Sequence, residues 1–579
     1  MTLRFVIAIV CFFLSAISLS LGIAQRTVWL GPDTYTESVQ IQDTPLAMVT
    51  GRALTGYPGK QSMRLAGADS KLVAYGRAAD VEAWIGDTTY THISRNEAGE
   101  LTQSLIQGSE AVAPNPAGSD LWLDEFIQDT EDDLRASFTL SSDTALLVAI
   151  DGTKPIAAEL TLQWPRDNST PYAGPLILAG AVLAALGFIA YISGLIQWRR
   201  QRGPRRKSSR APKPPKPISA SKAYKPSRAG IAAPQKGRRA AGRSFGGALV
   251  GIALVPALLA GCTPATQPTP SPEPTVDPEP VSNVAVTEAQ LNRILARVKT
   301  VIDEADAEAD KDLLATRAKG ASYDARVANY TIRSRRSSID PLPQIPGGPP
   351  QFVLPEATLN WPRTAMAVVV EEAEEGNRQV LLVLEQASPR EPYRLVYDLD
   401  LVQSLPAVAA PTVGAPRLAA DLDLLLLTPK QTVNAYAKLL LDGEKAEHYD
   451  NFEILEDSLP DQIGAKFKAD RKRKLQANAR VSFGTELDKY EPLAFSTADS
   501  GAVVAGYFID TETVRPRGQY QEVAVSGESR HLLGKASTMR GITVGYGIQL
   551  LFYVPVDGDA GQIRLLGYKQ QIVSAKEVR

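Results

Sequence analysis

The chain has 579 residues, with 62 Lys and Arg residues against 64 Asp and Glu residues, and 44% of its residues are hydrophobic. These averages describe an ordinary soluble protein of about three or four domains. Its 2 cysteines lie far apart and its 3 histidines are scattered, which excludes a disulfide framework and a Cys-rich zinc module and leaves little material for a His-based metal site. We therefore expect no metal and no cofactor.

Residues 1–24 form the first of three apolar segments. The stretch from Phe5 to Ala24 contains no charged residue and is long enough to span a bilayer, which needs about 20 apolar residues. Its end, Gly22-Ile23-Ala24, also places small residues where a signal peptidase would cut. An N-terminal transmembrane anchor and a cleaved signal peptide both remain open, and both export residue 25 onward.

Residues 25–172 are predicted to form an exported all-β domain, a small sandwich or an open barrel. Apolar and polar residues alternate over short stretches, as in 72–75 and 160–164, and turn signals such as Gly56-Tyr57-Pro58-Gly59 separate them. Asp80, Glu82 and Trp84 alternate as on one face of a strand, which fits a sugar-binding face or a solvated face equally.

An acidic cluster lies between Asp120 and Asp133 in the same domain. Calcium prefers such oxygen ligands, but the cluster lacks the alternating Asp/Asn pattern and the central Gly of an EF-hand loop. We interpret the cluster as a solvated acidic face.

Residues 173–198 are predicted to form a transmembrane helix. Trp198, Arg199 and Arg200 follow an uncharged run, and this combination fixes that helix end in the cytoplasm. Residues 199–243 then hold 16 Lys and Arg residues without any acidic residue, which predicts a disordered basic loop. Such a loop is attracted to anionic lipid head groups. Nucleic-acid binding is not expected, because aromatic residues are nearly absent from the loop.

Residues 244–262 form the third apolar segment, which ends in Leu259-Ala260-Gly261-Cys262. This tetrapeptide resembles the lipobox of bacterial lipoproteins, in which the cysteine is lipidated and the bond before it is cut. A basic flank precedes the segment and a Pro-rich linker, residues 263–285, follows it, which agrees with the resemblance. The alternative is an uncleaved third transmembrane helix with an incidental Cys262.

The charge distribution agrees with this topology. Residues 25–172 carry 10 basic and 21 acidic residues, and residues 263–579 carry 35 and 43. Membrane insertion favours export of acidic parts and retention of a basic loop. We therefore expect a multi-pass protein of the cell membrane with exported domains 25–172 and 263–579 and a cytoplasmic loop 199–243.

Residues 286–410 and 411–579 are predicted to form two exported α+β domains that start alike. Each begins with a capping box, Thr287-Glu288-Ala289-Gln290 or Thr428-Pro429-Lys430-Gln431, ahead of a helical pattern. Three strands are expected in each part, at 365–370, 379–384 and 393–401 and at 502–509, 542–554 and 563–573. This element order resembles tandem NTF2-like domains. The whole layout also resembles uncharacterised membrane-anchored envelope proteins and lipoproteins of actinobacteria.

Few residues are candidates for chemistry. Glu447, His448 and Asp450 follow the second capped helix, where His448 paired with a carboxylate would be a general base, although a charged turn has the same composition. A basic helix from Lys466 to Lys474 fits teichoic-acid phosphates, lipid head groups or local acidic residues. NTF2-like domains include enzymes, scaffolds and ligand carriers, so the resemblance selects no activity.

We expect a non-enzymatic cell-envelope protein, a membrane-anchored scaffold or binding module that presents its exported domains to a wall polymer, a lipid or a membrane-protein partner. Two alternatives remain. One is a wall- or lipid-modifying enzyme that uses His448 and its carboxylates in an NTF2-like cone, and the other is a lipid carrier.

Overall fold

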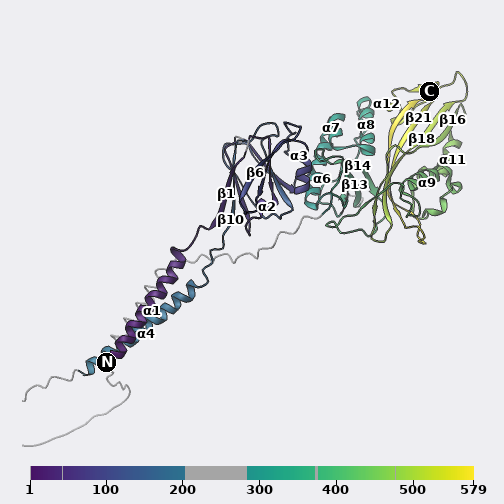
Figure 1. The fold of residues 1–579 in the computed structure, drawn as a ribbon. Helices are drawn as coiled ribbons and strands as arrows, with labels where there is room; N and C mark the ends of the chain where they lie inside the picture. Colours follow the sequence, from purple (N-terminus) through teal and green to yellow (C-terminus); the bar gives the residue numbers. More distant parts are fainter. Residues whose placement is uncertain (1, 42, 69, 202–282, 372–375, 476) are drawn as a thin grey trace, which may run out of the picture. The chain divides into compact units, whose positions relative to one another are not determined.

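The computed structural model of the protein describes residues 2–579 except 42, 69, 202–282, 372–375 and 476 (Figure 1). It contains two compact units, which we describe separately: Met1–Asp33 with Arg166–Val276, and Thr34–Pro165 with Asp277–Arg579. Cys262, the apolar segment 244–262 and most of the basic loop and the Pro-rich linker lie outside the described residues. The described chain is rich in β-sheet, and two of its helices are long and apolar enough to cross a membrane.

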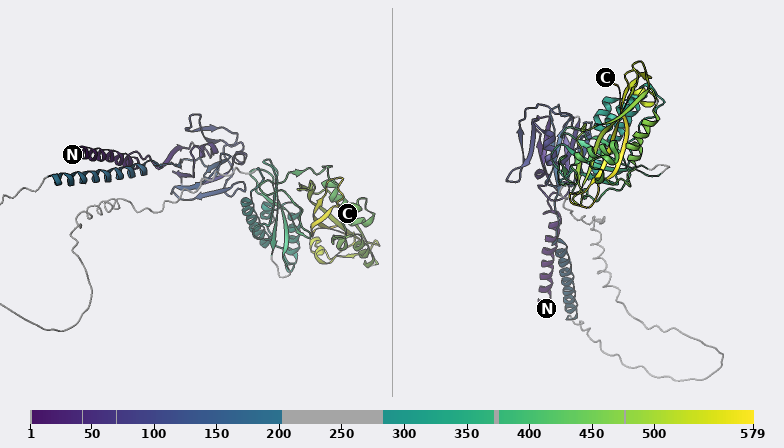
Figure 2. Two further views of the ribbon diagram at one scale, coloured as in Figure 1. Left: turned by 90° about the horizontal axis from the view of Figure 1, so that it is seen from below. Right: turned by 90° about the vertical axis from the view of Figure 1, so that its right-hand side faces the viewer.

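The first unit is a pair of antiparallel helices, α1 (Thr2–Thr27) and α4 (Ala173–Gln201), which lie side by side (Figure 2). Ser15 Oγ donates a hydrogen bond of 2.7 Å to the Gly180 carbonyl, and Ser18 Oγ donates one of 2.7 Å to the Leu176 carbonyl. Apolar burial does not distinguish a neighbouring helix from lipid, so membrane helices associate through such polar contacts and through close packing.

Glycines on α4 supply the close packing. Three of them, seven residues apart, each face a large side chain of α1, and these side chains are also seven residues apart. The pairs are Gly180 with Leu19, Gly187 with Phe12, and Gly194 with Phe5. A β-carbon at Gly180 would lie 2.6 Å from Leu19 Cγ, so the approach of the two helices requires glycine there. The contact therefore extends along most of α1, from Phe5 to Leu19.

The N-terminal part of the second unit, residues 34–165, contains two sheets that share a core. Their strand orders are β1-β10-β3-β8 and β6-β5-β2-β9-β4-β7. Apolar residues of both sheets, among them Val73, Leu146 and Leu162, fill the space between them, as in a sandwich. The strands are β1 (Thr34–Gln40), β2 (Leu46–Thr50), β3 (Gln61–Ala66), β4 (Lys71–Arg77), β5 (Tyr90–Arg95), β6 (Leu101–Ile106), β7 (Asp124–Gln128), β8 (Leu134–Phe138), β9 (Thr144–Ala149) and β10 (Glu159–Pro165).

Two short helices, α2 (Gly51–Leu54) and α3 (Ala78–Ile85), interrupt these strands. The prediction that Asp80, Glu82 and Trp84 share a strand face is wrong, because all three lie on α3. Asp80 and Trp84 are one helical turn apart and buried, whereas Glu82 is exposed. The missed signal is this i, i+4 spacing. Trp84 packs on Trp122, with ring centroids 5.5 Å apart, on the side of the six-stranded sheet that faces away from the sandwich core.

The described residues from 283 to 579 form the α+β part of the second unit, and both predicted capping boxes are confirmed. Thr287 Oγ1 accepts a hydrogen bond from the Gln290 amide, and Thr428 Oγ1 accepts one from the Gln431 amide. The helices are α6 (Glu288–Glu308), α7 (Lys311–Arg317), α8 (Gly320–Arg335), α9 (Pro429–Asp442), α10 (Leu459–Ile463), α11 (Ala465–Lys474) and α12 (Gly527–Leu533), with the 3-10 turns η1 (Gly443–Lys445) and η2 (Tyr449–Asn451).

All six predicted strands are confirmed, and they belong to one ten-stranded sheet. Its order is β11-β12-β13-β14-β22-β21-β18-β17-β15, with β16 paired to β18. The strands are β11 (Phe352–Pro355), β12 (Arg363–Glu371), β13 (Arg378–Gln386), β14 (Arg394–Leu401), β15 (Arg417–Leu418), β16 (Ala479–Glu486), β17 (Leu493–Ser496), β18 (Ala502–Pro516), β21 (Ile542–Val554) and β22 (Arg564–Glu577). A separate pair is β19 (Val523–Ala524) with β20 (Ser537–Thr538).

The ten-stranded sheet doubles back on itself, so its two halves lie between two layers of helices. Ala367 and Leu382 face α6, whereas the next residues along the strands, Val368 and Leu381, face the other half of the sheet. In that other half, Phe508 faces α9. Successive residues of a strand point to opposite sides, so each strand contributes to two cores. Figure 1 shows α6 and α8 on one side of the strands and α9 and α11 on the other.

A buried ionic contact joins the two halves of this sheet. Asp398 on β14 lies 2.5 Å from Lys569 Nζ on β22 and 3.8 Å from Arg326 Nη2 on α8. Burial alone would raise the pKa of Asp398, but Lys569 and Arg326 bring it below its ordinary value. The carboxylate is therefore held in its charged form between the two halves.

The packing of α1 on α4 predicts that Gly187→Cys will form a disulfide with Cys11. A β-carbon at Gly187 would lie 3.3 Å from Cys11 Cβ, close to the separation of about 3.5–4.5 Å that disulfides have. After mild oxidation in membranes, mass spectrometry should find a peptide pair joined through these positions. Gly174→Cys is the matched control, because no atom lies within 4 Å of a β-carbon there. Equal cross-linking of both variants, or none in either, would contradict the helix pair.

Candidate functional site

Buried polar side chains concentrate where residues 34–165 meet residues 277–579, within the second compact unit. We call this contact the docking interface. One side consists of α3 and residues 110–125, and the other consists of α6, Arg317 at the end of α7, and residues 361–363 and 390–393.

Asp80 is the first centre of the docking interface. Its Oδ1 accepts a hydrogen bond of 2.7 Å from Arg363 Nη2, and its Oδ2 accepts one of 3.1 Å from Arg77 Nη1. Asp80 is 1% exposed, Arg363 0% and Arg77 5%. The Arg363 guanidinium also lies 3.8 Å from the centroid of a ring of Trp361. Because α3 begins directly after β4, Asp80 in the first turn of α3 lies three residues after Arg77, the last residue of β4.

Two guanidinium groups share this one carboxylate. Nε and Nη2 of Arg77, and Nε and Nη1 of Arg363, are buried and have no hydrogen-bond partner among the described residues. Burial lowers the pKa of Arg77 below its ordinary value; Asp80 opposes this shift and Arg363 reinforces it. Asp80 is therefore the counter-charge for both buried guanidinium groups, those of Arg77 and Arg363.

Asp120 is the second centre. Its Oδ2 accepts hydrogen bonds from Arg317 Nη1 at 2.5 Å and from the Tyr393 backbone amide at 2.8 Å, and its Oδ1 lies 3.4 Å from Arg297 Nη1. The Asp120 side chain is buried, so the interpretation of a solvated acidic face is wrong for this residue, although Asp124 is exposed. The arginine partners lie 177 and 197 residues away in the chain, beyond the reach of a local pattern.

Arg390 makes the outermost contact of the docking interface. Its Nε and Nη2 donate hydrogen bonds to the carbonyls of Trp84 and Ile85 at 2.8 and 2.6 Å, and its Nη1 lies 2.8 Å from Glu110 Oε2. The hydrogen bonds from Arg390 and Thr88 lower the pKa of Glu110 below its ordinary value. This arginine therefore caps the C-terminal end of α3, where unpaired carbonyls favour a cation.

The start of α6 supplies the remaining contacts. Gln290 Nε2 donates a hydrogen bond of 2.8 Å to the Leu121 carbonyl, and Arg293 Nη2 donates one of 2.7 Å to the Trp122 carbonyl. The Gln290 side chain also completes the capping box of α6, because its Oε1 accepts a hydrogen bond from the Thr287 backbone amide. The sequence identified Gln290 as a cap, but no local signal indicated its second role.

Glu447 and His448 lie between the turns η1 and η2 after α9, and Asp450 lies on η2. Glu447 and Asp450 are exposed and His448 is partly exposed. The hydrogen bonds and ion pairs of the described residues do not join the His448 side chain to either carboxylate. In the part of the chain that the structure describes, no cluster of three His, Cys, Asp or Glu side chains is arranged to hold a metal ion.

A cavity of about 430 Å³ lies beside the predicted basic helix, between the end of α11 and the strands β18, β19 and β21. Valine and isoleucine side chains line its interior, among them Val514, Val523 and Ile542. Arg471 and Lys474 stand at its rim, and Arg471 Nη2 lies 2.8 Å from Glu512 Oε1. The lining of the cavity is therefore mixed, because polar side chains such as Asn478, Glu512 and Ser526 expose more of its surface than the apolar ones do.

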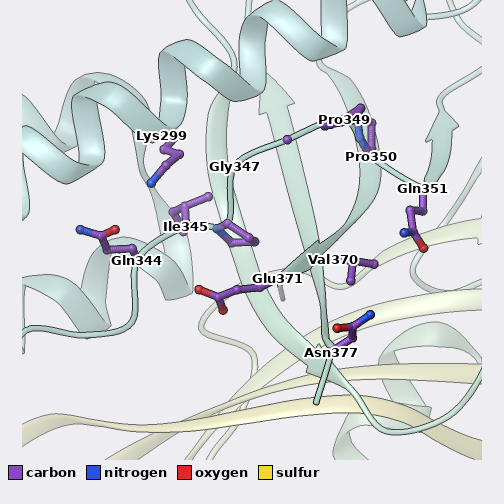
Figure 3. A pocket seen from close by; sticks show the side chains of 12 residues that line it. Lys299, Gln344, Ile345, Gly347, Pro349, Pro350, Gln351, Val370, Glu371 and Asn377 are labelled. Atoms are coloured by element: carbon purple, nitrogen blue, oxygen red, sulfur yellow. The ribbon is translucent and has the colours of Figure 1, made fainter. Parts of the chain in front are cut away.

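A second cavity, of about 510 Å³, lies beside the loop Pro346-Gly347-Gly348-Pro349-Pro350 (Figure 3). Lys299 of α6, Glu371 of β12 and Asn377 border it. Lys299 Nζ pairs with Asp303 at 2.7 Å, so its charge is already compensated. This cavity contains no arrangement of groups that indicates a particular chemistry.

The shared carboxylate predicts that Asp80→Ala will strongly destabilise the second unit. The substitution leaves Arg77 and Arg363 buried without a counter-charge, which costs about 3–5 kcal/mol of unfolding free energy. Urea unfolding of the purified protein, followed by the fluorescence of Trp84, Trp122 and Trp361, measures the change. Asp133→Ala is the control, because its pair with Arg64 is solvent-exposed, and it should leave the unfolding midpoint almost unchanged. Equal midpoints for the two variants would contradict the role of Asp80.

Comparison with known proteins gives one match. Residues 282–577, just over half of the chain, match the family model described as a domain of unknown function, DUF8094. No curated protein and no solved structure matches the chain. The matched range contains the arginine side of the docking interface and leaves out the side that carries Asp80 and Asp120. The chain belongs to the DUF8094 family.

Proposed function

We propose that this protein is a membrane-anchored, non-enzymatic module of the cell envelope, which holds one composite body at the outer face of the membrane for binding to a wall polymer, a lipid or a membrane partner. The body consists of residues 34–165 and 277–579. The observation that carries the proposal is the docking interface, because it joins parts that lie on opposite sides of an apolar helix in the sequence.

The docking interface constrains the topology. Residues 34–165 precede α4 and residues 277–579 follow it, and parts that share buried ion pairs must lie on one side of a membrane. If α4 crosses the bilayer, the chain between residues 202 and 282 must cross back. The apolar segment 244–262 is suited to that return by its composition. The basic residues after α4 favour a cytoplasmic position for the loop, and therefore an external position for the composite body.

The packing of α1 on α4 supports a retained anchor over a cleaved signal peptide. A signal peptide has no lasting partner, whereas Ser15 and Ser18 hydrogen-bond to backbone carbonyls of α4. Two helices that remain paired in the membrane would give the composite body a firmer attachment than one helix.

The element order of residues 286–579 supports tandem NTF2-like domains as a proposal. Capped helices precede antiparallel strands in both halves, and the strands of the two halves pack face to face through residues such as Val368 and Tyr507. This arrangement gives each half a helix-covered face of its own.

The proposed topology predicts which introduced cysteines will react with a membrane-impermeant maleimide on intact cells. Val112→Cys and Tyr520→Cys, both at exposed positions, should be labelled from outside, and Ser209→Cys only after permeabilisation. The parent chain, which carries Cys11 and Cys262, is the control for background labelling. Labelling of Val112→Cys and Tyr520→Cys from different sides would refute the proposal.

A lipid carrier is the second candidate function, and the cavity beside α11 favours it. Its volume of about 430 Å³ lies within the range of about 300–1,000 Å³ for ligand sites. An acyl chain would contact Val514, Val523 and Ile542 within a lining that also contains polar groups, and an anionic head group would lie near Arg471 and Lys474.

This candidate predicts that a photoactivatable long-chain fatty acid will label the cavity of the purified, delipidated protein. Val523→Trp fills the interior and should reduce labelling about tenfold, because the added ring displaces the acyl chain. Lys474→Glu should also weaken it, whereas Lys466→Glu, on the same helix but away from the cavity, should not. Labelled peptides that map elsewhere and resist Val523→Trp would eliminate the lipid carrier.

A further inference from the structure

We propose that the contacts of the docking interface alone hold residues 34–165 and residues 277–579 together. The two parts would then stay associated as separate chains after the polypeptide is cut between them. The DUF8094 part would then be a protein whose partner is an acidic, strand-rich domain. The inference concerns the second unit alone and does not depend on the membrane topology.

The cores of the two parts indicate that each is complete by itself. The core of the sandwich contains residues of 34–165 only, and three further clusters, around α6, around α9 and between the halves of the sheet, contain residues of 277–579 only. Trp361 is the one described side chain that joins an apolar cluster of the other part. Domains with separate cores meet through interfaces that resemble those between proteins.

The charges across the interface are complementary. Residues 277–579 supply arginines, and residues 34–165 supply carboxylates and carbonyl oxygens, with Arg77 as the one arginine described above on the carboxylate side. The arginines are Arg293, Arg297, Arg317, Arg363 and Arg390, and the carboxylates are Asp80, Glu110, Asp120 and Glu125. Arginine is enriched at the energetic centres of protein–protein interfaces because its planar guanidinium makes several hydrogen bonds at once.

The polar character of this contact suits two surfaces that are also exposed to water when apart. Arg390 donates its hydrogen bonds to residues of the other part and is 27% exposed at the side chain even when docked. Asp120 receives both of its arginines from the other part. Without the partner, water would hydrate these polar groups. Separation of the two parts would therefore not expose a large apolar surface, as separation at an obligate interface does.

The family match supplies an independent observation. The model of the DUF8094 domain ends at residue 577 and begins at residue 282, so it includes one side of the docking interface and excludes the other. The bounds of the family model therefore separate the two sides of the docking interface into different parts of the chain. A processed chain, such as one cut before Cys262, would remain one assembly through this contact.

The test uses the full chain with a protease site inserted after Val276 and an affinity tag at the C-terminus. Cutting in detergent yields residues 1–276 and 277–579, and the second piece lacks all three apolar segments, so a shared micelle does not hold the pieces together. We expect the untagged piece to be retained on the affinity resin after cutting. Its release from the resin would overturn the proposal.

Arg317→Ala with Arg390→Ala should release the untagged piece about tenfold faster, because both side chains bind the other part and lie at the surface of their own. Arg378→Ala with Arg471→Ala is the matched control, since these arginines pair with Glu371 and Glu512 inside residues 277–579 and away from the docking interface. Circular dichroism of each uncut variant verifies folding. Equal retention of both double variants would show that another contact holds the pieces, which would also overturn the proposal.

Discussion

Two buried carboxylates, Asp80 and Asp120, pair with arginines that lie far away in the sequence, Asp80 together with its neighbour Arg77, and the architecture of the second unit depends on these ion pairs. A buried carboxylate or guanidinium without a partner costs several kcal/mol, so neither side of the contact tolerates a mismatch. Apolar cores are less selective, because many side chains of similar volume fill them. The ion pairs thus determine which surfaces of the two parts meet, while the cores determine that each part folds.

The helices α1 and α4 also associate with each other, but through different contacts. In the second unit, charged groups hold the two parts together, and water would hydrate the same groups if the parts were separate. Between apolar helices, glycines and serines act instead, as Gly187 and Ser15 illustrate, because close contact and a hydrogen bond to a backbone carbonyl are what lipid does not provide. The chain therefore uses small residues in one unit and arginines in the other.

Local patterns predicted what local forces determine. The capping boxes at Thr287 and Thr428 involve atoms three residues apart, and the long strands follow from runs of β-branched and apolar residues, so both were visible in the sequence. The helix α3 was missed because its eight residues fit a strand alternation equally well when the buried partner of Asp80 is unknown. That partner, Arg363, lies 283 residues away. The two cavities also escaped prediction, since each is formed by elements that are distant in the sequence.

The candidate catalytic residues illustrate the limit of motif reasoning. Glu447, His448 and Asp450 are neighbours in sequence, yet among the described residues no side-chain ion pair joins any two of them.

The way the chain enters its C-terminal part has a mechanical consequence. Residues 284–286 are buried, and the Ala285 amide donates a hydrogen bond of 2.7 Å to the Glu356 carbonyl, immediately before the capping box of α6. Tension in the linker would therefore reach the fold one helical turn from Gln290, whose amide holds the Leu121 carbonyl of the other part. A force applied there would act on both parts of the second unit. It would not act first on the long hydrogen-bonded strands of the ten-stranded sheet.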